Sequence, residues 1–165
     1  MEQRKQILTA GAANKKLRRM ALQVVEENYT ETQLVLIGIK NKGAVIAEKI
    51  SQYIKEIFTG EVQVLQLGLD KKHPLEIQLD TEMDFNGKVI VLIDDVANSG
   101  RTMLYALKPL LQQLPKKMQT LALVERTHKS FPVDVDYVGF SVSTTADENI
   151  KVEVENGEVT GAWMD

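Results

Sequence analysis

The sequence contains no cysteine and only two histidines, His73 and His128, which lie far apart. The absence of cysteine excludes a disulfide framework and a thiolate metal site. The two histidines have no ligand spacing, so we do not expect a transition-metal site. No apolar stretch is long enough to span a membrane, and the chain does not begin with the apolar core of a signal peptide. These absences favour a cytoplasmic protein that has no membrane partner.

The chain also lacks a strong net charge, a repeat and any low-complexity segment. Its formal charge is −3, which gives no general attraction to nucleic acid or to a membrane. With 44% hydrophobic and 26% charged residues, the composition is that of an ordinary globular protein. The length of 165 residues is sufficient for a real core. We expect a single domain over residues 1–165.

The most informative stretch is 88–102, which reads KVIVLIDDVANSGRT. Its apolar run predicts a buried strand, and Asp94 and Asp95 follow where the strand should end. Ligands of open α/β sheets bind at the carboxyl ends of strands. A short loop then leads into a helix, and its residues are Ala97, Asn98, Ser99, Gly100, Arg101 and Thr102. Small hydroxyl residues and glycine at a helix entry leave backbone N–H groups free to bind phosphate.

Each feature alone has an ordinary structural explanation, since acids can end a strand and Ser99 can cap a helix. The strand, the acid pair and the loop together at this spacing favour a functional site. The loop is neither a Walker loop, because no Gly-Lys-Ser/Thr is present, nor a dinucleotide fingerprint, which needs three spaced glycines.

Hydrophobic periodicity along the rest of the chain indicates alternating strands and helices. Amphipathic helices are predicted over 12–28, from residue 46 to residue 57, and after residue 102, where Pro109 should either kink the helix or end it near Lys108. Strands are predicted over 34–39, 62–67, 89–96, 119–125 and 136–142, followed by a hairpin turning at Asn156-Gly157. This alternation predicts an α/β fold with a parallel sheet and helices on both faces.

The stretch 88–102 resembles the signature of the type I phosphoribosyltransferases: an apolar strand, two acids, a few variable residues, then Ser or Thr, Gly, any residue and Thr. The resemblance implies a Rossmann-like parallel sheet flanked by helices, with a small hood or flap and a C-terminal hairpin. It also implies that the chain binds phosphoribosyl pyrophosphate (PRPP). Asp94 and Asp95 would hold the ribose hydroxyls, directly or through Mg²⁺, and residues 97–102 would bind the 5′-phosphate.

A second loop, formed by Lys40, Asn41, Lys42 and Gly43, follows the predicted strand 34–39. On its own, the loop has an ordinary explanation, since lysines are common in solvent-exposed loops. It resembles the pyrophosphate loop of the same family, which often has a cis or strained non-proline peptide. The sequence GIKNKG is similar to that loop in the pyrimidine operon regulators, with lysine at position 42 where an arginine is usual. Lysine keeps the charge but lacks the planar fork of arginine.

Residues 69–87 show no clear pattern, which in a compact domain indicates a lid or a mobile segment. Family members carry a flap here that closes over the reacting centre. The arginine of the regulators' flap is absent, and Lys71, Lys72 and His73 are the candidates to replace it.

The acceptor base is suggested by the segment ALVERTHKSFPVDVDYVGF. Together with ILTAGAANKKLRRMALQVVEEN, it resembles the pyrimidine operon regulators, which double as uracil phosphoribosyltransferases. It also resembles the base-binding region of the hypoxanthine-guanine enzymes. That likeness implies that Tyr137, Val138 and Arg126 bind the base, although Tyr137 also fits a half-buried strand aromatic. Asn98 replaces an acid and Glu125 replaces a lysine of the 6-oxopurine pattern, so uracil is the predicted base.

The prediction is therefore a Mg²⁺-dependent uracil phosphoribosyltransferase and, as in relatives, a homodimer. The main alternative is a catalytically weak PRPP or nucleotide sensor that binds RNA through a basic helix face, formed by Lys15, Lys16, Arg18 and Arg19. A flavodoxin-like receiver domain has the right architecture but explains neither the phosphate loop nor the Lys-Gly loop.

Overall fold

The central element is a six-stranded sheet in the order β4-β3-β2-β5-β6-β7. The computed structural model describes residues 4–165. Neighbouring strands are parallel except for β3 and β4, which are antiparallel. The strands are β2 (Gln33–Ile39), β3 (Glu61–Leu69), β4 (Ile77–Leu79), β5 (Val89–Ala97), β6 (Lys117–Arg126) and β7 (Tyr137–Val142). This arrangement confirms the predicted α/β fold.

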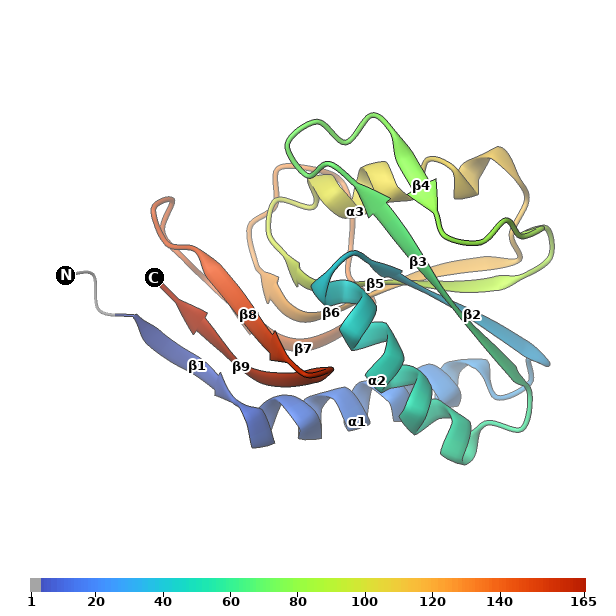
Figure 1. Cartoon of the computed structure of the whole chain (residues 1–165), viewed down its shortest axis with the longest axis horizontal. Coiled ribbons are helices and arrows are strands. Elements are labelled where there is room, and N and C mark those ends of the chain that lie inside the picture. Colours follow the sequence, from blue (N-terminus) through green and yellow to red (C-terminus); the bar gives the residue numbers. More distant parts are fainter. Residues whose placement is uncertain (1–3) are drawn as a thin grey trace.

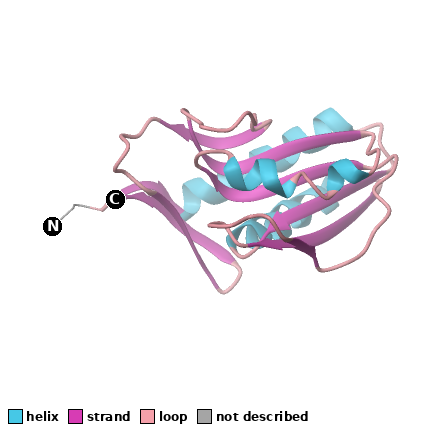
Figure 2. Ribbon diagram, turned by 90° about the horizontal axis from the view of Figure 1, so that it is seen from above, coloured by secondary structure: helices cyan, strands magenta, loops and turns pink. Residues whose placement is uncertain are grey.

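Helices cover both faces of the sheet (Figures 1 and 2). On one face lie α1 (Ala10–Asn28) and α2 (Lys42–Ile57), and on the other lie α3 (Arg101–Ala106) and the short 3₁₀ helix η1 (Leu110–Gln112). Alternate residues of β5 pack into the two cores, because side chains of a strand point to opposite faces. Val91 and Ile93 join the core under α1 and α2, whereas Ile90 and Leu92 join the core under α3.

The helix boundaries follow from local sequence. Helix α1 begins after Thr9, whose side-chain oxygen accepts a hydrogen bond from the N–H of Ala12 at 3.1 Å. Helix α3 ends at Ala106, and the chain resumes as η1 directly after Pro109. The predicted early helix end near Lys108 is confirmed, since proline cannot donate the hydrogen bond that would continue the helix.

A second, three-stranded sheet has the order β1-β9-β8. Its strands are β1 (Lys5–Thr9), β8 (Ile150–Glu155) and β9 (Glu158–Met164). The predicted hairpin turn is confirmed, with positive φ angles at Asn156 (51°) and Gly157 (76°), as a tight two-residue turn requires. Figure 1 shows this sheet on the side of the molecule to which the carboxyl ends of β5, β6 and β7 point. Strands β1 and β4 were not predicted.

The fold brings the ends of its five parallel strands together at one edge, and one of them is the end of β3 at Leu69. The parallel strands β2, β5, β6 and β7 end at Ile39, Ala97, Arg126 and Val142, and their pairing places these ends side by side. Within residues 4–165, no helix is long and apolar enough to cross a membrane. The loops that leave this carboxyl edge carry the predicted site residues.

Candidate active site at the carboxyl edge of the sheet

Two adjacent carboxylates lie at the centre of the carboxyl edge. Asp94 and Asp95 belong to the end of β5, which runs between β2 and β6, and their exposed fractions are only 1% and 7%. The backbone N–H of Asp95 donates a hydrogen bond to Oδ1 of Asp94 at 2.9 Å. This hydrogen bond stabilises a carboxylate that is otherwise removed from water.

The electrostatics of the pair are unfavourable in the free protein. Burial raises the pKa of Asp94 well above its usual value, and the neighbouring charge of Asp95 raises it further. Among residues 4–165, Asp94 forms one ion pair, with Lys71, whose Nζ lies 3.7 Å from Oδ2 and which lowers the same pKa to a lesser extent. Carboxylate oxygens in such a pair can accept hydrogen bonds from hydroxyl groups or ligate a cation.

The predicted phosphate loop is a tight turn directly next to the acids. Ala97 is buried at the end of β5, and Gly100, with a φ of 85°, caps the start of α3. A Cβ atom at Gly100 would lie 2.7 Å from Cγ1 of Val133, so this position requires glycine for space as well as for conformation. The backbone carbonyl of Ser99 accepts hydrogen bonds from the N–H groups of Ser130 and Phe131, both at 3.0 Å.

A small cavity of about 80 Å³ lies between Asp94 and this loop. Its lining comprises Lys71, Asp94, Val96 and residues 97–103, and therefore includes every residue of the predicted phosphate loop. The structure thus places Asp94 and the loop around one cavity.

The second predicted loop lies on the opposite flank of the acids. Lys40 follows β2, and the peptide bond between Lys40 and Asn41 is cis, in the loop where the family resemblance implies a cis or strained peptide. A Cβ atom at Gly43 would lie 2.8 Å from the carbonyl oxygen of Ile93 and 3.1 Å from Oδ1 of Asp94. Only glycine therefore permits the start of α2 to approach the acid pair this closely.

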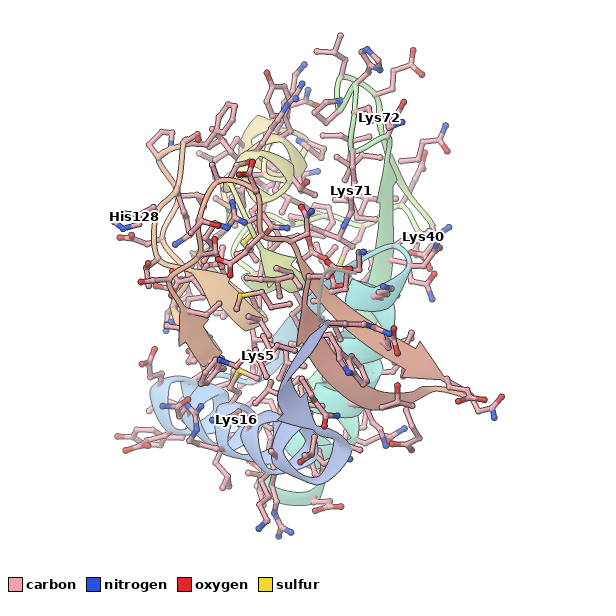
Figure 3. The ribbon with its side chains drawn as sticks, turned by 90° about the vertical axis from the view of Figure 1, so that its left-hand side faces the viewer. Lys5, Lys16, Lys40, Lys71, Lys72 and His128 are labelled. Carbon is pink, nitrogen blue, oxygen red and sulfur yellow. The ribbon has the colours of Figure 1, made fainter. Side chains whose placement is uncertain are left out.

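The predicted flap, residues 69–87, contacts both the acid pair and the predicted phosphate loop. Besides the contact of Lys71 with Asp94, Nη2 of Arg101 donates to the backbone carbonyl of Lys72 at 3.3 Å. Figure 3 shows Lys40, Lys71 and Lys72 on one side of the molecule. His73 is exposed, and its Nδ1 lies 3.8 Å from Oδ2 of Asp70. Of the three flap candidates, Lys71 alone contacts the acid pair.

Tyr137 and Val138 do not lie at the carboxyl edge, and their predicted role in base binding is wrong. Both are at the start of β7, and Tyr137 is 2% exposed within the core under α1. The hydroxyl of Tyr137 lies within hydrogen-bond distance of two acceptors near the start of β6, the side-chain oxygens of Glu27 (2.9 Å) and Gln119 (2.8 Å). Burial and the nearby Glu27 raise the pKa of Tyr137. The backbone carbonyl of Val138 accepts a hydrogen bond from Arg19.

Arg126, the third residue predicted to bind the base, does end a strand at this edge. Its Nη2 donates to the backbone carbonyl of Glu148, so it links the end of β6 to the segment before β8. The same strand end carries an arrangement that the sequence did not reveal, in which Glu125 contacts Lys129 and Ser141. Lys129 and Ser141 come from different loops and strands, so no local motif could have identified the set.

The basic face of α1 is only partly available to a partner. Arg19 donates to the backbone carbonyls of Val138 and Gly139, and Lys16 lies over the ring of Phe140 at 5.5 Å. Lys15 and Arg18 are exposed.

Comparison with known proteins agrees with this geometry. The family model described as phosphoribosyl transferase domain matches residues 3–156. The chain belongs to the phosphoribosyltransferase family. Among its relatives, the bifunctional protein PyrR of Ligilactobacillus salivarius is 35% identical over 95% of this chain and 94% of that protein. The bifunctional protein PyrR of a Thermoanaerobacter species is 33% identical over 94% of this chain and 93% of that protein.

Solved structures of phosphoribosyltransferases share the fold. A hypoxanthine-guanine phosphoribosyltransferase from Bacillus anthracis superposes with a TM-score of 0.74 at 18% identity, covering 91% of this chain and 87% of that one. The hypoxanthine phosphoribosyltransferase of Trypanosoma cruzi gives a TM-score of 0.75 at 16% identity, covering 84% and 82%. At these identities the likeness is one of fold alone.

The raised pKa of Asp94 predicts that this residue destabilises the free phosphoribosyltransferase at neutral pH. Between the usual pKa of 3.8 and the higher pKa in the folded state, the folded protein binds more protons than the unfolded chain. The free energy of unfolding therefore falls as pH rises through this window, and the cost stays at higher pH. Asp94→Asn should raise the melting temperature at pH 7.5, by about 2–4 °C for each kcal/mol gained.

The measurement is thermal unfolding of wild type and Asp94→Asn at several pH values. The increase in melting temperature caused by Asp94→Asn should shrink as the pH approaches 4, near the usual aspartate pKa of 3.8. The exposed residue Asp147 provides a matched control, because Asp147→Asn should leave the melting temperature unchanged. An Asp94→Asn variant less stable than wild type at pH 7.5 would contradict the assignment.

Proposed function

We propose that this phosphoribosyltransferase transfers the phosphoribosyl group of PRPP to uracil and releases pyrophosphate. The observation that carries the proposal is the position of the buried acid pair between two loops, residues 97–102 and residues 40–43, at one sheet edge. Residues 97–102 would bind the 5′-phosphate, and residues 40–43 would bind the pyrophosphate. Asp94 and Asp95 would then face the ribose hydroxyls.

The reaction is a substitution at C1 of the ribose. A ring nitrogen of the base forms a bond to C1, the bond from C1 to the pyrophosphate oxygen breaks, and its electron pair leaves with the pyrophosphate. The ring N–H proton of uracil passes to solvent. Positive charge develops on the sugar during bond breaking, and the fixed carboxylates Asp94 and Asp95 stabilise that charge electrostatically.

The acid pair also fits a bound Mg²⁺. This ion prefers oxygen ligands and is commonly held by one or two carboxylates together with substrate phosphate oxygens and water. Residues 4–165 contain no group of three or more histidine, cysteine, aspartate or glutamate side chains that could hold a metal ion alone. Asp94 and Asp95 would therefore share the ion with PRPP, and its charge would help to neutralise the departing pyrophosphate.

Uracil is supported as the acceptor by two residues that differ from the 6-oxopurine pattern. Asn98 stands where that pattern places an acid, and Glu125 stands where it places a lysine that contacts the purine carbonyl. The relatives at 35% and 33% identity also carry the name bifunctional protein PyrR, in keeping with the resemblance to the pyrimidine operon regulators.

The direct test measures pyrophosphate release from PRPP and Mg²⁺ with uracil, orotate, adenine, hypoxanthine, guanine and xanthine. We expect release with uracil alone, and we expect Asp95→Asn to abolish it while the circular dichroism spectrum is retained. Release only with a purine would refute the uracil assignment. If no base supports release but PRPP still binds in a calorimeter, the protein is a sensor and not an enzyme.

Lys71 is proposed to act as the cation of the flap, because it alone reaches the acid pair from that segment. Lys71→Met should lower kcat/KM for PRPP by roughly 10-fold to 100-fold, the effect of losing one hydrogen bond to a charged group. Lys72→Met is the matched control, since Lys72 contacts the site through its backbone carbonyl, and its kcat/KM should stay within about twofold of wild type. Equal losses in both variants would argue against a specific role for Lys71.

A second candidate function is RNA binding, and the exposed Lys15 and Arg18 are the observation that favours it. Since phosphate contacts release counterions, affinity for a pyrimidine-operon leader RNA should fall about as a power of the salt concentration. Filter binding at several salt concentrations should show this fall, and Lys15→Ala with Arg18→Ala should reduce its slope. A flat dependence on salt would exclude the role. The predicted homodimer can be checked by light scattering on the same samples.

A further inference from the structure

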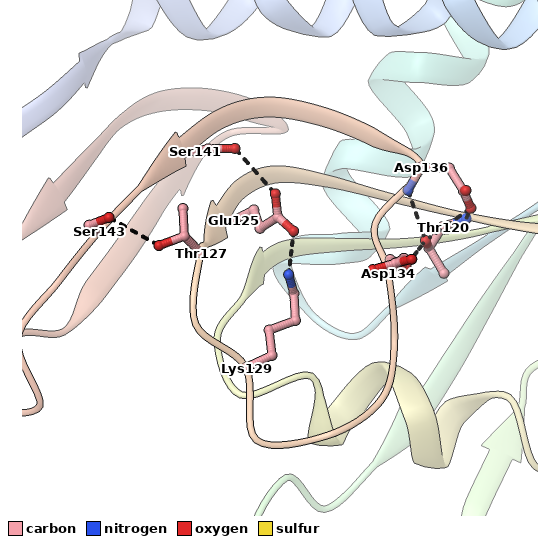
Figure 4. Close-up of polar contacts among 8 residues, drawn as sticks. All are labelled: Thr120, Glu125, Thr127, Lys129, Asp134, Asp136, Ser141 and Ser143. Carbon is pink, nitrogen blue, oxygen red and sulfur yellow. Dashed lines mark hydrogen bonds and ion pairs between the residues drawn. The ribbon is translucent and has the colours of Figure 1, made fainter.

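The ends of β6 and β7 carry an ion pair that the steps described above do not use. Glu125 lies at the end of β6, and its two carboxylate oxygens have different partners. One oxygen pairs with Nζ of Lys129, and the other accepts a hydrogen bond from Oγ of Ser141 at 3.2 Å. Figure 4 shows the carboxylate held between these two side chains. The side chains of Glu125 and Lys129 are only 17% and 12% exposed, so most of the pair is shielded from water.

This pair lies on the flank of the acid pair where an incoming base must bind. In a displacement at C1 the attacking base and the leaving pyrophosphate occupy opposite sides of the ribose. The loop assigned to pyrophosphate follows β2, on one side of β5, and Glu125 is on the other side. Glu125 pairs in register with Ala97, the first residue of the predicted phosphate loop. Because neighbouring strands are about 4.8 Å apart, the backbone of Glu125 lies directly beside the start of that loop.

Lys129 is also packed against the phosphate loop. Its Cδ lies 3.5 Å from the position that a Cβ atom of Gly100 would take. Lys129 therefore lies between Glu125 and the loop that holds the sugar phosphate. The pair is fixed relative to the ribose from two directions, by the strand pairing of Glu125 and by the packing of Lys129.

The pair presents one acceptor and one donor side by side. After their mutual contact, a carboxylate oxygen retains lone pairs and a lysine ammonium retains N–H groups. An acceptor beside a donor is complementary to a ring N–H beside a carbonyl, which is the lactam edge of an oxo-base. In uracil this edge is formed by N3–H and an adjacent carbonyl, on the part of the ring away from the N1 atom that attacks.

An amino-base presents the opposite pattern to the same pair. Cytosine has a bare ring nitrogen at N3 and an exocyclic amino group, so its lone pair would face the carboxylate of Glu125. Its amino group would face the ammonium of Lys129. A site built to hydrogen-bond one pattern rejects the other strongly, because its shielded polar groups are left unpaired.

We propose that the Glu125–Lys129 ion pair, positioned by Ser141, selects the acceptor by its lactam edge: Glu125 accepts the ring N–H and Lys129 donates to the adjacent carbonyl. The assignment rests on the proposed function, since it places the base on this flank. It defines the substrate class as oxo-bases and excludes cytosine and adenine. Glu125 and Lys129 would contact the base, whereas Ser141 is a positioning residue that acts through Glu125.

Nucleotide binding tests the assignment without requiring turnover. The affinities of UMP and CMP are measured by calorimetry for wild type, Glu125→Gln and Lys129→Met. Wild type should bind UMP at least about 100-fold more tightly than CMP. Glu125→Gln should bring the two affinities within about 10-fold of each other, because the amide can turn its NH₂ group toward the bare N3 of cytosine. Lys129→Met should weaken UMP binding without improving CMP binding.

Thr127→Val is the matched control, since it removes a hydroxyl contact with Ser143 (3.0 Å) between the same two strand ends (Figure 4). Its ratio of UMP to CMP affinity should equal that of wild type. If Glu125→Gln fails to fold, as shown by its melting curve, Ser141→Ala serves instead and should lower the ratio by a smaller factor. A ratio near one in wild type overturns the proposal. An unchanged ratio in Glu125→Gln, or in Ser141→Ala where that variant is used instead, also overturns it.

The outcomes also separate this proposal from the proposed function. Uracil-dependent pyrophosphate release with an unchanged ratio in Glu125→Gln would retain the enzyme and reject the role of the ion pair. Strong UMP preference that depends on Glu125, without pyrophosphate release for any base, would retain the recognition and reject the enzyme.

Discussion

The structure depends on holding two adjacent carboxylates almost out of water at the end of one strand. Asp94 and Asp95 repel each other, and burial penalises the charge on Asp94. One backbone hydrogen bond and the ion pair with the half-exposed Lys71 only partly offset this cost. Stability and function therefore oppose each other at this position, which is a common arrangement at catalytic sites. Replacing either acid with an apolar residue would suit the core and would remove the groups that respond to developing positive charge.

Two glycines make this arrangement possible by removing side-chain volume. Gly43 allows the start of α2 to approach Asp94, and Gly100 allows the phosphate loop to turn beneath Val133. In the proposed reaction these two loops, with the acids between them, would surround C1 of the ribose. The parallel sheet is the reason for the convergence, because each strand delivers its following loop to the same edge.

The sequence predicted those parts of the site that local patterns encode. Asp94, Asp95 and residues 97–102 form one continuous motif, and Lys40 to Gly43 follow a strand with a clear apolar run. The role of Tyr137 was predicted incorrectly because it depends on where β7 begins and on which face its side chain points. Strands β1 and β4 were missed since each is short and is defined by a partner strand elsewhere in the chain. The contact between Glu125 and Ser141 likewise arises only when β6 and β7 pair.

The small sheet has a consequence for the order in which the protein is made and folded. Its edge strand β1 pairs with β9, so Lys5 lies opposite Met164 and nearly the whole chain separates the two. On the ribosome, β1 has no partner until β9, residues Glu158–Met164, has been synthesised. Closing so long a loop is entropically slow, and the six-stranded sheet is built from strands closer together in sequence. The layer beside the carboxyl edge would thus be added last, over a catalytic framework that is already folded.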